Sequence, residues 1–279
     1  DMTKPRRVAV IDIGKTNAKV VVIDTRNGEE ITGDRRSNPV LRDGIYPHYD
    51  VEMLWSFILT SLRRFAEEPG FDAISITTHG ASAALLDENG DLAMPVLDYE
   101  HSYPASVAEA YLRIKPDFAE TGSPSLPAGL NLGAQIHFQK TAFPQEFAGV
   151  RSIVTYAQYW AGRLTGVQAT ETTSLGCHTD LWNPRLKAFS SLVERLGIAH
   201  LMAPVRSAFA MLGSGAVCLG VFLQGFVIVE PAPHELFMAG LIGVWALSRL
   251  TISRAVAPLA VLLILFMVGG RPSLTGMDD

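Results

Sequence analysis

The stretch RVAVIDIGKTNAKVVVID, residues 7–24, decides the fold. Its two ends, residues 7–13 and 18–24, are rich in valine and isoleucine, which favour β-strands. Only residues 14–17, with the sequence GKTN, separate the two runs. So short a connection between two strands predicts a β-hairpin.

The same hairpin contains the letters Gly-Lys-Thr, which also end the nucleotide-binding P-loop, Gly-x-x-x-x-Gly-Lys-Ser/Thr. Ala9 occupies the place of the first glycine, and a strand follows Thr16 where a P-loop requires a helix. The sequence therefore excludes a P-loop. Two interpretations stay open: an ordinary surface turn, or a phosphate-binding turn whose amides, hydroxyls and lysines face an anion while Asp12 holds Mg²⁺ through water.

Further elements alternate downstream and indicate an α/β domain with a mixed sheet. Asp50 is placed to cap a helix, and Pro69 and Gly70 end it. The predicted elements are a third strand after the turn at 27–28, a helix at 49–68, a buried strand at 72–79 and a hairpin at 82–98 turned at Asn89 and Gly90.

Charge divides the chain into two regions. The net charge of −5 offers no basic surface for nucleic acid, which excludes that partner. Residues 1–206 carry 20 Lys/Arg and 24 Asp/Glu, whereas residues 207–279 carry three Arg and four acidic residues. Cys177 and Cys218 match no metal or redox spacing, which fits a reducing compartment. We predict one domain at 1–206 and a different environment for 207–279.

The second region contains three uncharged runs, residues 208–229, 236–248 and 255–270. Crossing a bilayer takes roughly 20 apolar residues, so these runs predict a membrane-spanning helical tail. A buried α/β core is the alternative. Arg249 and Arg254 lie between the second and third runs, and by the positive-inside rule they place the polar region in the cytoplasm, anchored in the bacterial inner membrane.

The segment AVIDIGKTNAKVVVID, residues 9–24, resembles the first phosphate motif of the actin/hexokinase/heat-shock ATPase superfamily. Within it, the chain is similar to the FGGY carbohydrate kinases, a group of xylulokinase, fuculokinase, rhamnulokinase and glycerol kinase relatives. Three further segments agree in order and spacing: residues 74–101 with a His-Gly pair, 121–138 with a Thr-Gly helix entry, and 156–184 with the letters LTG and ATE. The resemblance covers about residues 6–212. It implies a ribonuclease-H-like N-terminal lobe, ATP and Mg²⁺ as cofactors, and a sugar as substrate.

The resemblance also implies roles for individual residues. Asp12 would organise Mg²⁺ through water. The phosphate-binding residues would be Gly14, Lys15, Thr16, Asn17 and Lys19. The sugar-binding residues would be His79, Gly80, Asp98, Tyr99, Glu100, Asn131 and Gln135. Lys15 stands where many relatives have a small hydroxyl residue, and a strand-end histidine without substrate contact is the alternative for His79.

Two parts of the family pattern are not found in the sequence: the glycine-rich segment with the general-base Asp, and the second, adenine-binding lobe. We therefore expect no catalytic residue and no complete kinase from this chain alone. The tail resembles the first membrane spans of O-antigen ligase/polymerase-type proteins, so the alternatives are a membrane polysaccharide-assembly fragment or a non-catalytic sugar- or nucleotide-binding remnant of a fusion. The expected partners are a small-molecule sugar and the membrane through residues 208–270, with a homo-oligomer left open.

Overall fold

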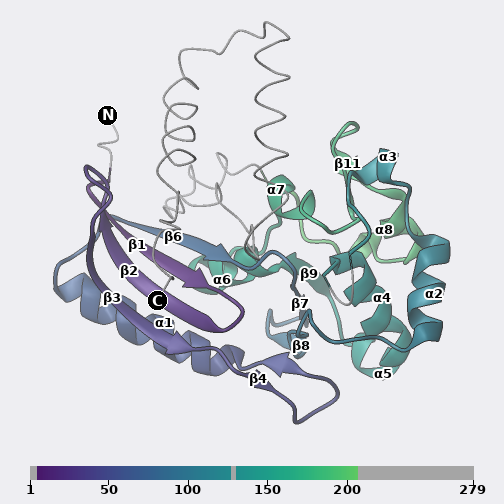
Figure 1. Cartoon of the computed structure of the whole chain (residues 1–279), viewed down its shortest axis with the longest axis horizontal. Coiled ribbons are helices and arrows are strands. Elements are labelled where there is room, and N and C mark those ends of the chain that lie inside the picture. The colour runs from purple at the N-terminus through teal and green to yellow at the C-terminus, as the bar shows by residue number, and fades with distance from the viewer. Residues whose placement is uncertain (1–4, 127–129, 207–279) are drawn as a thin grey trace, which may run out of the picture. The chain divides into compact units, whose positions relative to one another are not determined.

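The computed structural model describes residues 5–126 and 130–206, and its main sheet carries the hairpin of residues 7–24 (Figure 1). The strands of this sheet, in spatial order, are β3 (Glu30–Ser37), β2 (Asn17–Asp24), β1 (Arg7–Ile13) and β6 (Ala73–Thr78). Strand β2 pairs antiparallel with both β1 and β3, and β6 pairs parallel with β1. The predicted mixed sheet is thereby confirmed.

The long helix α1 (Val51–Glu67) packs against β1, β2 and β3 and runs along the main sheet (Figure 1). Asp50 caps it: its side chain accepts a hydrogen bond of 2.9 Å from the Met53 amide, which has no partner inside the helix. The helix ends at Glu68, directly before Pro69. The helix predicted at residues 49–68 is therefore confirmed, together with its cap.

A second sheet has the order β8 (Leu92–Met94), β7 (Ala83–Leu86) and β9 (Ser152–Thr155). The β7–β8 pair is the predicted hairpin, and Gly90 adopts a φ of 86° in its turn. Helix α6 (Tyr156–Thr165) contacts β6 of the main sheet as well as β7 and β9, so it links the two sheets.

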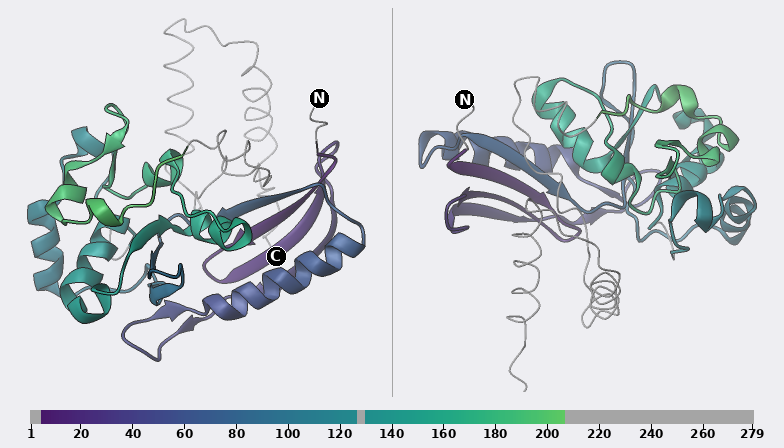
Figure 2. Two further views of the ribbon diagram at one scale, coloured as in Figure 1. Left: turned by 180° about the vertical axis from the view of Figure 1, so that it is seen from behind. Right: turned by 90° about the horizontal axis from the view of Figure 1, so that it is seen from above.

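The remaining elements are short and lie mostly around the second sheet (Figure 2). Two small antiparallel pairs are β4 (Val40–Leu41) with β5 (His48–Tyr49), and β10 (Trp182–Asn183) with β11 (Ala188–Phe189). The other helices are α2 (Ala105–Ile114), α3 (Phe118–Thr121), α4 (Leu132–Ala142), α5 (Pro144–Phe147), α7 (Thr172–Leu175), α8 (Ser191–Arg195) and a 3₁₀ turn at Ala199–Leu201.

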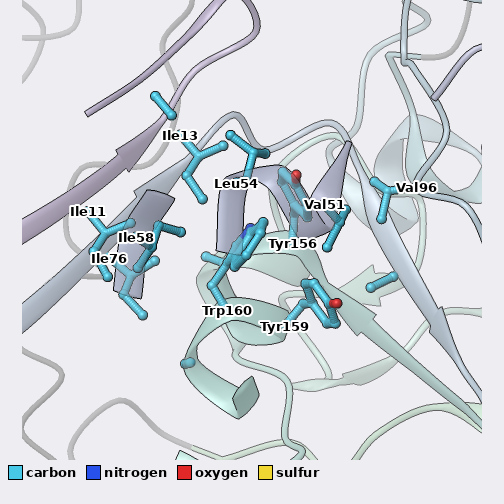
Figure 3. Close-up of a cluster of buried hydrophobic side chains, with 14 of the residues drawn as sticks. Ile11, Ile13, Val51, Leu54, Ile58, Ile76, Val96, Tyr156, Tyr159 and Trp160 are labelled. Carbon is cyan, nitrogen blue, oxygen red and sulfur yellow. The ribbon is translucent and has the colours of Figure 1, made fainter. Parts of the chain in front are cut away.

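The main apolar core lies between the main sheet, α1 and α6 (Figure 3). Ile11 and Ile13 of β1 meet Leu54 and Ile58 of α1 there, and Trp160 of α6 fills the centre with no exposed surface. Trp182 lies in a second core cluster around α4. Both tryptophans therefore serve packing.

Among residues 5–126 and 130–206, no helix combines the length and hydropathy that a membrane span needs. The runs at 208–229, 236–248 and 255–270, on which the spanning prediction rests, lie outside the described residues. The domain boundary at 206 and the homo-oligomer also stay predictions.

Candidate functional site

The turn between β1 and β2 is held by backbone and side-chain hydrogen bonds. The Gly14 amide donates to the Asn17 carbonyl at 2.9 Å, and Asn17 Nδ2 donates to Thr16 Oγ1 at 3.1 Å. A Cβ atom at position 14 would lie only 3.1 Å from the Asn17 carbonyl oxygen, which explains the glycine. The four predicted phosphate-binding residues of the turn thus form one compact loop at the end of two buried strands.

Asp12 and Lys19 lie opposite each other in the β1–β2 register, one pair before the turn. Asp12 Oδ2 and Lys19 Nζ are 3.9 Å apart, and both side chains are about two-fifths exposed at 43% and 42%. An ion pair so loose and so solvated contributes little to stability. Both groups therefore stay accessible to a ligand, and the carboxylate oxygens of Asp12 are of the kind that Mg²⁺ takes.

The side chain of Lys15 points to the predicted sugar-binding residues and not along the phosphate loop. Its ammonium contacts Asp98 Oδ1 directly, lies 2.9 Å from Glu100 Oε2, and sits 4.8 Å from the centre of the Tyr99 ring. Two carboxylates and an aromatic face attract a cation more strongly than open solvent does. The backbone of Lys15 belongs to the predicted phosphate-binding turn, but its ammonium lies among the residues predicted to bind the sugar.

Asp98 is the centre of this cluster. Its Oδ1 also accepts hydrogen bonds of 3.2 Å from the Tyr49 hydroxyl and from the Glu100 amide. The Asp98 side chain is only 7% exposed, so it depends on these donors and on Lys15 to stay buried as a charge. The structure therefore joins the two predicted half-sites through the contacts of Lys15 with Asp98 and its neighbours.

His79 directly follows β6 and packs against Tyr99 of the same cluster. Its amide donates to the Ile13 carbonyl at 3.0 Å, and its ring centre is 5.1, 5.1 and 4.9 Å from the rings of Tyr49, Tyr99 and Tyr156. Within the described part of the chain, neither ring nitrogen has a hydrogen-bond partner. Burial above all, and then the charge of Lys15, lower the pKa of His79 to about 3. At neutral pH His79 is therefore an uncharged imidazole.

Gly80 and Gln135 shape the segment that follows His79. Gln135, buried in α4, donates from Nε2 to the Ala81 carbonyl and so fixes this segment against the helix. Among the described residues, a Cβ atom at Gly80 would meet Cys177 Sγ at 3.9 Å, an ordinary contact distance, so the neighbours do not require a glycine here. Gln135 thus holds the segment that follows the predicted His-Gly pair against α4.

Asn131 has a different place. Its side chain caps α4 by accepting from the Ala134 amide at 3.1 Å, accepts from the Tyr111 hydroxyl at 3.0 Å, and donates to Asp180 Oδ2 at 2.9 Å. None of these partners is a predicted site residue. Sugar binding by Asn131 stays a prediction, and the role that the structure gives it is to cap a helix inside a buried network.

Three residues of the site were missed from the sequence: Tyr49 and Tyr156, which surround His79, and Asn38, which holds the turn. Tyr49 and Tyr156 carry no local signal, because only the folded chain brings them to His79. Asn38 did carry a local signal, because it directly follows the third predicted strand. The observed register pairs Ser37 with Asn17 and so places Asn38 beside the turn.

The buried, neutral His79 predicts a dependence of stability on pH. The unfolded chain takes up a proton on this histidine near 6.5, whereas the folded chain keeps it neutral down to about 3. Between these values the unfolded state binds more protons, so the unfolding free energy falls as the pH drops below 6.5, by up to about 1.4 kcal/mol per pH unit. Urea unfolding of the wild type and of His79→Phe between pH 7 and 4.5 measures this.

The difference in pH dependence between the wild type and His79→Phe isolates the contribution of His79 from that of the other histidines. Phenylalanine fits among the aromatic rings but does not titrate. We expect the phenylalanine variant to lose less stability than the wild type as the pH falls. Parallel curves for the two proteins over this range would mean that His79 is protonated in the folded chain.

Comparison with known proteins now identifies the family. The model of the FGGY family of carbohydrate kinases, N-terminal domain, matches residues 8–216. L-fuculokinase of Haemophilus influenzae is 25% identical over 213 residues, which cover 68% of this chain and 43% of that protein. The crystal structure of a carbohydrate kinase from Novosphingobium aromaticivorans is 41% identical with a TM-score of 0.65, over 71% of this chain and 42% of the other.

A ligand-bound xylulose kinase from Lactobacillus acidophilus is similar in fold alone, at 18% identity and a TM-score of 0.62, over 72% of this chain and 42% of that protein. The chain thus spans less than half the length of these relatives. The family match stops at residue 216, so the resemblance of the tail to O-antigen ligase/polymerase-type proteins gains no support. Since the match takes in most of the chain, this protein belongs to the FGGY family of carbohydrate kinases.

Proposed function

We propose that this chain carries the phosphate-binding loop and the sugar-binding cluster of an ATP-dependent kinase that phosphorylates a hydroxyl group of a neutral sugar. The observation that carries the proposal is the contact of Lys15 with Asp98 and Glu100. Phosphoryl transfer requires the acceptor hydroxyl and the transferred phosphate to be neighbours. One side chain here spans the two groups of residues to which the family resemblance gives these tasks.

The phosphate side rests on residues 14–17 and on Asp12. Backbone amides in a tight turn form a concave site for anions. Asp12, with its half-exposed carboxylate one residue pair before the turn, fits a Mg²⁺ ion held through water. When bound, Mg²⁺ would neutralise charge on the nucleotide phosphates. Lys19, beside Asp12, would add a second positive charge on the same side.

The sugar side offers acceptors for hydroxyl groups and aromatic faces. Asp98 and Glu100 supply carboxylate oxygens, while Tyr99 lies between Lys15 and His79. The formal charge of Lys15, Asp98 and Glu100 together is −1, and the pKa of His79 makes the imidazole neutral. A negatively charged cluster repels a sugar acid and accepts hydrogen bonds from an uncharged sugar, so we assign a neutral sugar as substrate.

The chemistry that these residues supply is binding and orientation. Asp98, buried and held by three donors, presents a fixed acceptor to the sugar, and a fixed acceptor costs little entropy on binding. The base that takes the proton of the sugar hydroxyl is not assigned to any residue described here.

Calorimetry on the chain tests this proposal. Titration with a panel of neutral aldoses and ketoses should give binding with at least one of them, and the matching aldonic acid should bind at least tenfold more weakly. Asp98→Asn should reduce the affinity for the neutral sugar, whereas Asp117→Asn, at the start of α3 and outside the cluster, should not. Tighter binding of the acid than of the neutral sugar would contradict the charge argument.

A further inference from the structure

Asn38 is buried next to the phosphate-binding turn and bonds to it twice. Its side-chain Nδ2 donates to the Gly14 carbonyl at 2.9 Å, and its backbone amide donates to the Thr16 carbonyl at 2.8 Å. Only 2% of its surface is exposed. The residue that directly follows β3 therefore bonds to the turn between β1 and β2 at two carbonyl groups.

The two hydrogen bonds from Asn38 fix the direction of two backbone amide groups in the turn. In a trans peptide the N–H points opposite to the C=O of the same peptide unit. The Gly14 carbonyl shares its peptide with the Lys15 amide, and the Thr16 carbonyl shares its peptide with the Asn17 amide. Because Asn38 draws both carbonyls to itself, the N–H groups of Lys15 and Asn17 point away from it.

One of these amides is released from a bond that a hairpin normally makes. In a two-residue hairpin loop, the Asn17 amide would donate back to the Gly14 carbonyl, as a partner to the observed bond from Gly14 to Asn17. The Asn38 side chain donates to that carbonyl, and the described residues show no bond from the Asn17 amide to it. Asn38 thus supplies the donor that the Gly14 carbonyl receives, and the Asn17 amide is left available.

Asn38 also carries a cost that packing does not explain. Its Oδ1 is buried and has no hydrogen-bond partner among the described residues. An unsatisfied buried oxygen destabilises the folded state, so an apolar residue would serve mere packing better. The Asn38 side chain therefore contributes through its Nδ2 donor, which bonds to the Gly14 carbonyl of the turn.

We propose that Asn38 is a positioning residue for phosphate binding: by holding the Gly14 and Thr16 carbonyls, it aims the amides of Lys15 and Asn17 at an anion. The inference rests on the proposed phosphate role of the turn. It adds the residue after β3 to the site, and it assigns the anion contact to two backbone groups in place of the Lys15 ammonium.

Amide hydrogen exchange in the unmodified chain tests the geometry without any substitution. We expect the Gly14 amide to exchange slowly, because it is bonded to Asn17, and the amides of Lys15 and Asn17 to exchange fast. Slow exchange of the Lys15 and Asn17 amides in the free chain would overturn the inference, since it would mean that both have internal partners.

Substitution tests the consequence for binding, with magnesium tripolyphosphate as the probe. Asn38→Asp keeps the shape but replaces the donor by an acceptor that repels the Gly14 carbonyl, and Asn38→Ala removes the donor without adding charge. Both should weaken tripolyphosphate binding at least tenfold and leave the affinity for the neutral sugar within twofold. Asn27→Asp, an exposed asparagine in the β2–β3 turn, brings the same charge change and should leave both affinities unchanged.

The outcomes separate this inference from the proposed function. No binding of tripolyphosphate by the wild type would refute the phosphate role of the turn, and the exchange pattern would then still decide whether Asn38 aims the two amides. Equal losses of sugar and tripolyphosphate affinity in Asn38→Ala would show a merely structural role and overturn the inference. An unchanged tripolyphosphate affinity in both Asn38 variants would overturn it as well.

Discussion

Lys15→Met is expected to lower the unfolding free energy by about 2–4 kcal/mol and to weaken sugar binding. The substitution leaves Asp98, with 7% of its side chain exposed, without its cation. Removing one partner of a buried ion pair is costly because the remaining charge stays desolvated. The value lies below that of a fully buried pair because Lys15 is 19% exposed and Glu100 is 64% exposed.

Urea unfolding and sugar calorimetry measure both effects of Lys15→Met, and the double variant Lys15→Met/Asp98→Asn supplies the coupling. Since the second substitution removes the stranded charge, the double variant should be more stable than Lys15→Met alone. Lys187→Met, an exposed lysine between β10 and β11, is the matched control and should change stability by less than about 0.5 kcal/mol. Unchanged stability and sugar affinity with weakened nucleotide binding would show that the Lys15 ammonium faces the phosphates.

Trp160→Ala is expected to lower the unfolding free energy by about 3–5 kcal/mol. The indole is fully buried at the centre of the main core (Figure 3). Its ring lies 6.3 Å from the Trp55 ring and meets the Tyr156 and Tyr159 rings edge-on at 5.7 and 5.3 Å. The cavity left by alanine cannot close without moving β1, α1 and α6 together, because all three elements pack at this point.

The main core also contacts the candidate site, because Tyr156 packs against both Trp160 and the His79 ring. Trp160→Ala should therefore weaken sugar binding in addition to stability. Leu186→Ala is the control, because that leucine is 74% exposed and its loss leaves no cavity. A loss of less than about 1 kcal/mol in Trp160→Ala would show that the core is not centred on this indole.

The strands and helices could be predicted where residues close in the sequence favour one backbone conformation. The valine and isoleucine runs of β1 and β2 flank a four-residue turn, and Asp50 directly precedes the apolar face of α1. Each of these patterns favours one backbone conformation within a few residues, so tertiary contacts reinforce the local preference.

The sequence predicts the candidate site as a set of segments, but it does not predict the directions of the side chains in those segments. Lys15 and Asp98 are 83 residues apart, and their contact exists only because the turn of β1–β2 and the segment after β8 meet in the fold. A lysine in a phosphate loop has a long, flexible side chain, and the nearest carboxylates decide where its charge lies. Asn131 shows the same limit, since its segment fits the family while its side chain caps α4.

The central proposal is that the turn of residues 14–17 binds phosphates and that the cluster of Asp98, Tyr99 and Glu100 binds the sugar beside it. Nuclear magnetic resonance of the ¹⁵N-labelled chain tests this proposal most directly, by adding a non-hydrolysable magnesium ATP analogue and the neutral sugar separately. We expect the nucleotide to shift the amides of residues 14–17 most strongly and the sugar to shift those of residues 98–100. Shifts by both ligands that lie outside these two segments, with residues 14–17 and 98–100 unaffected, would contradict it.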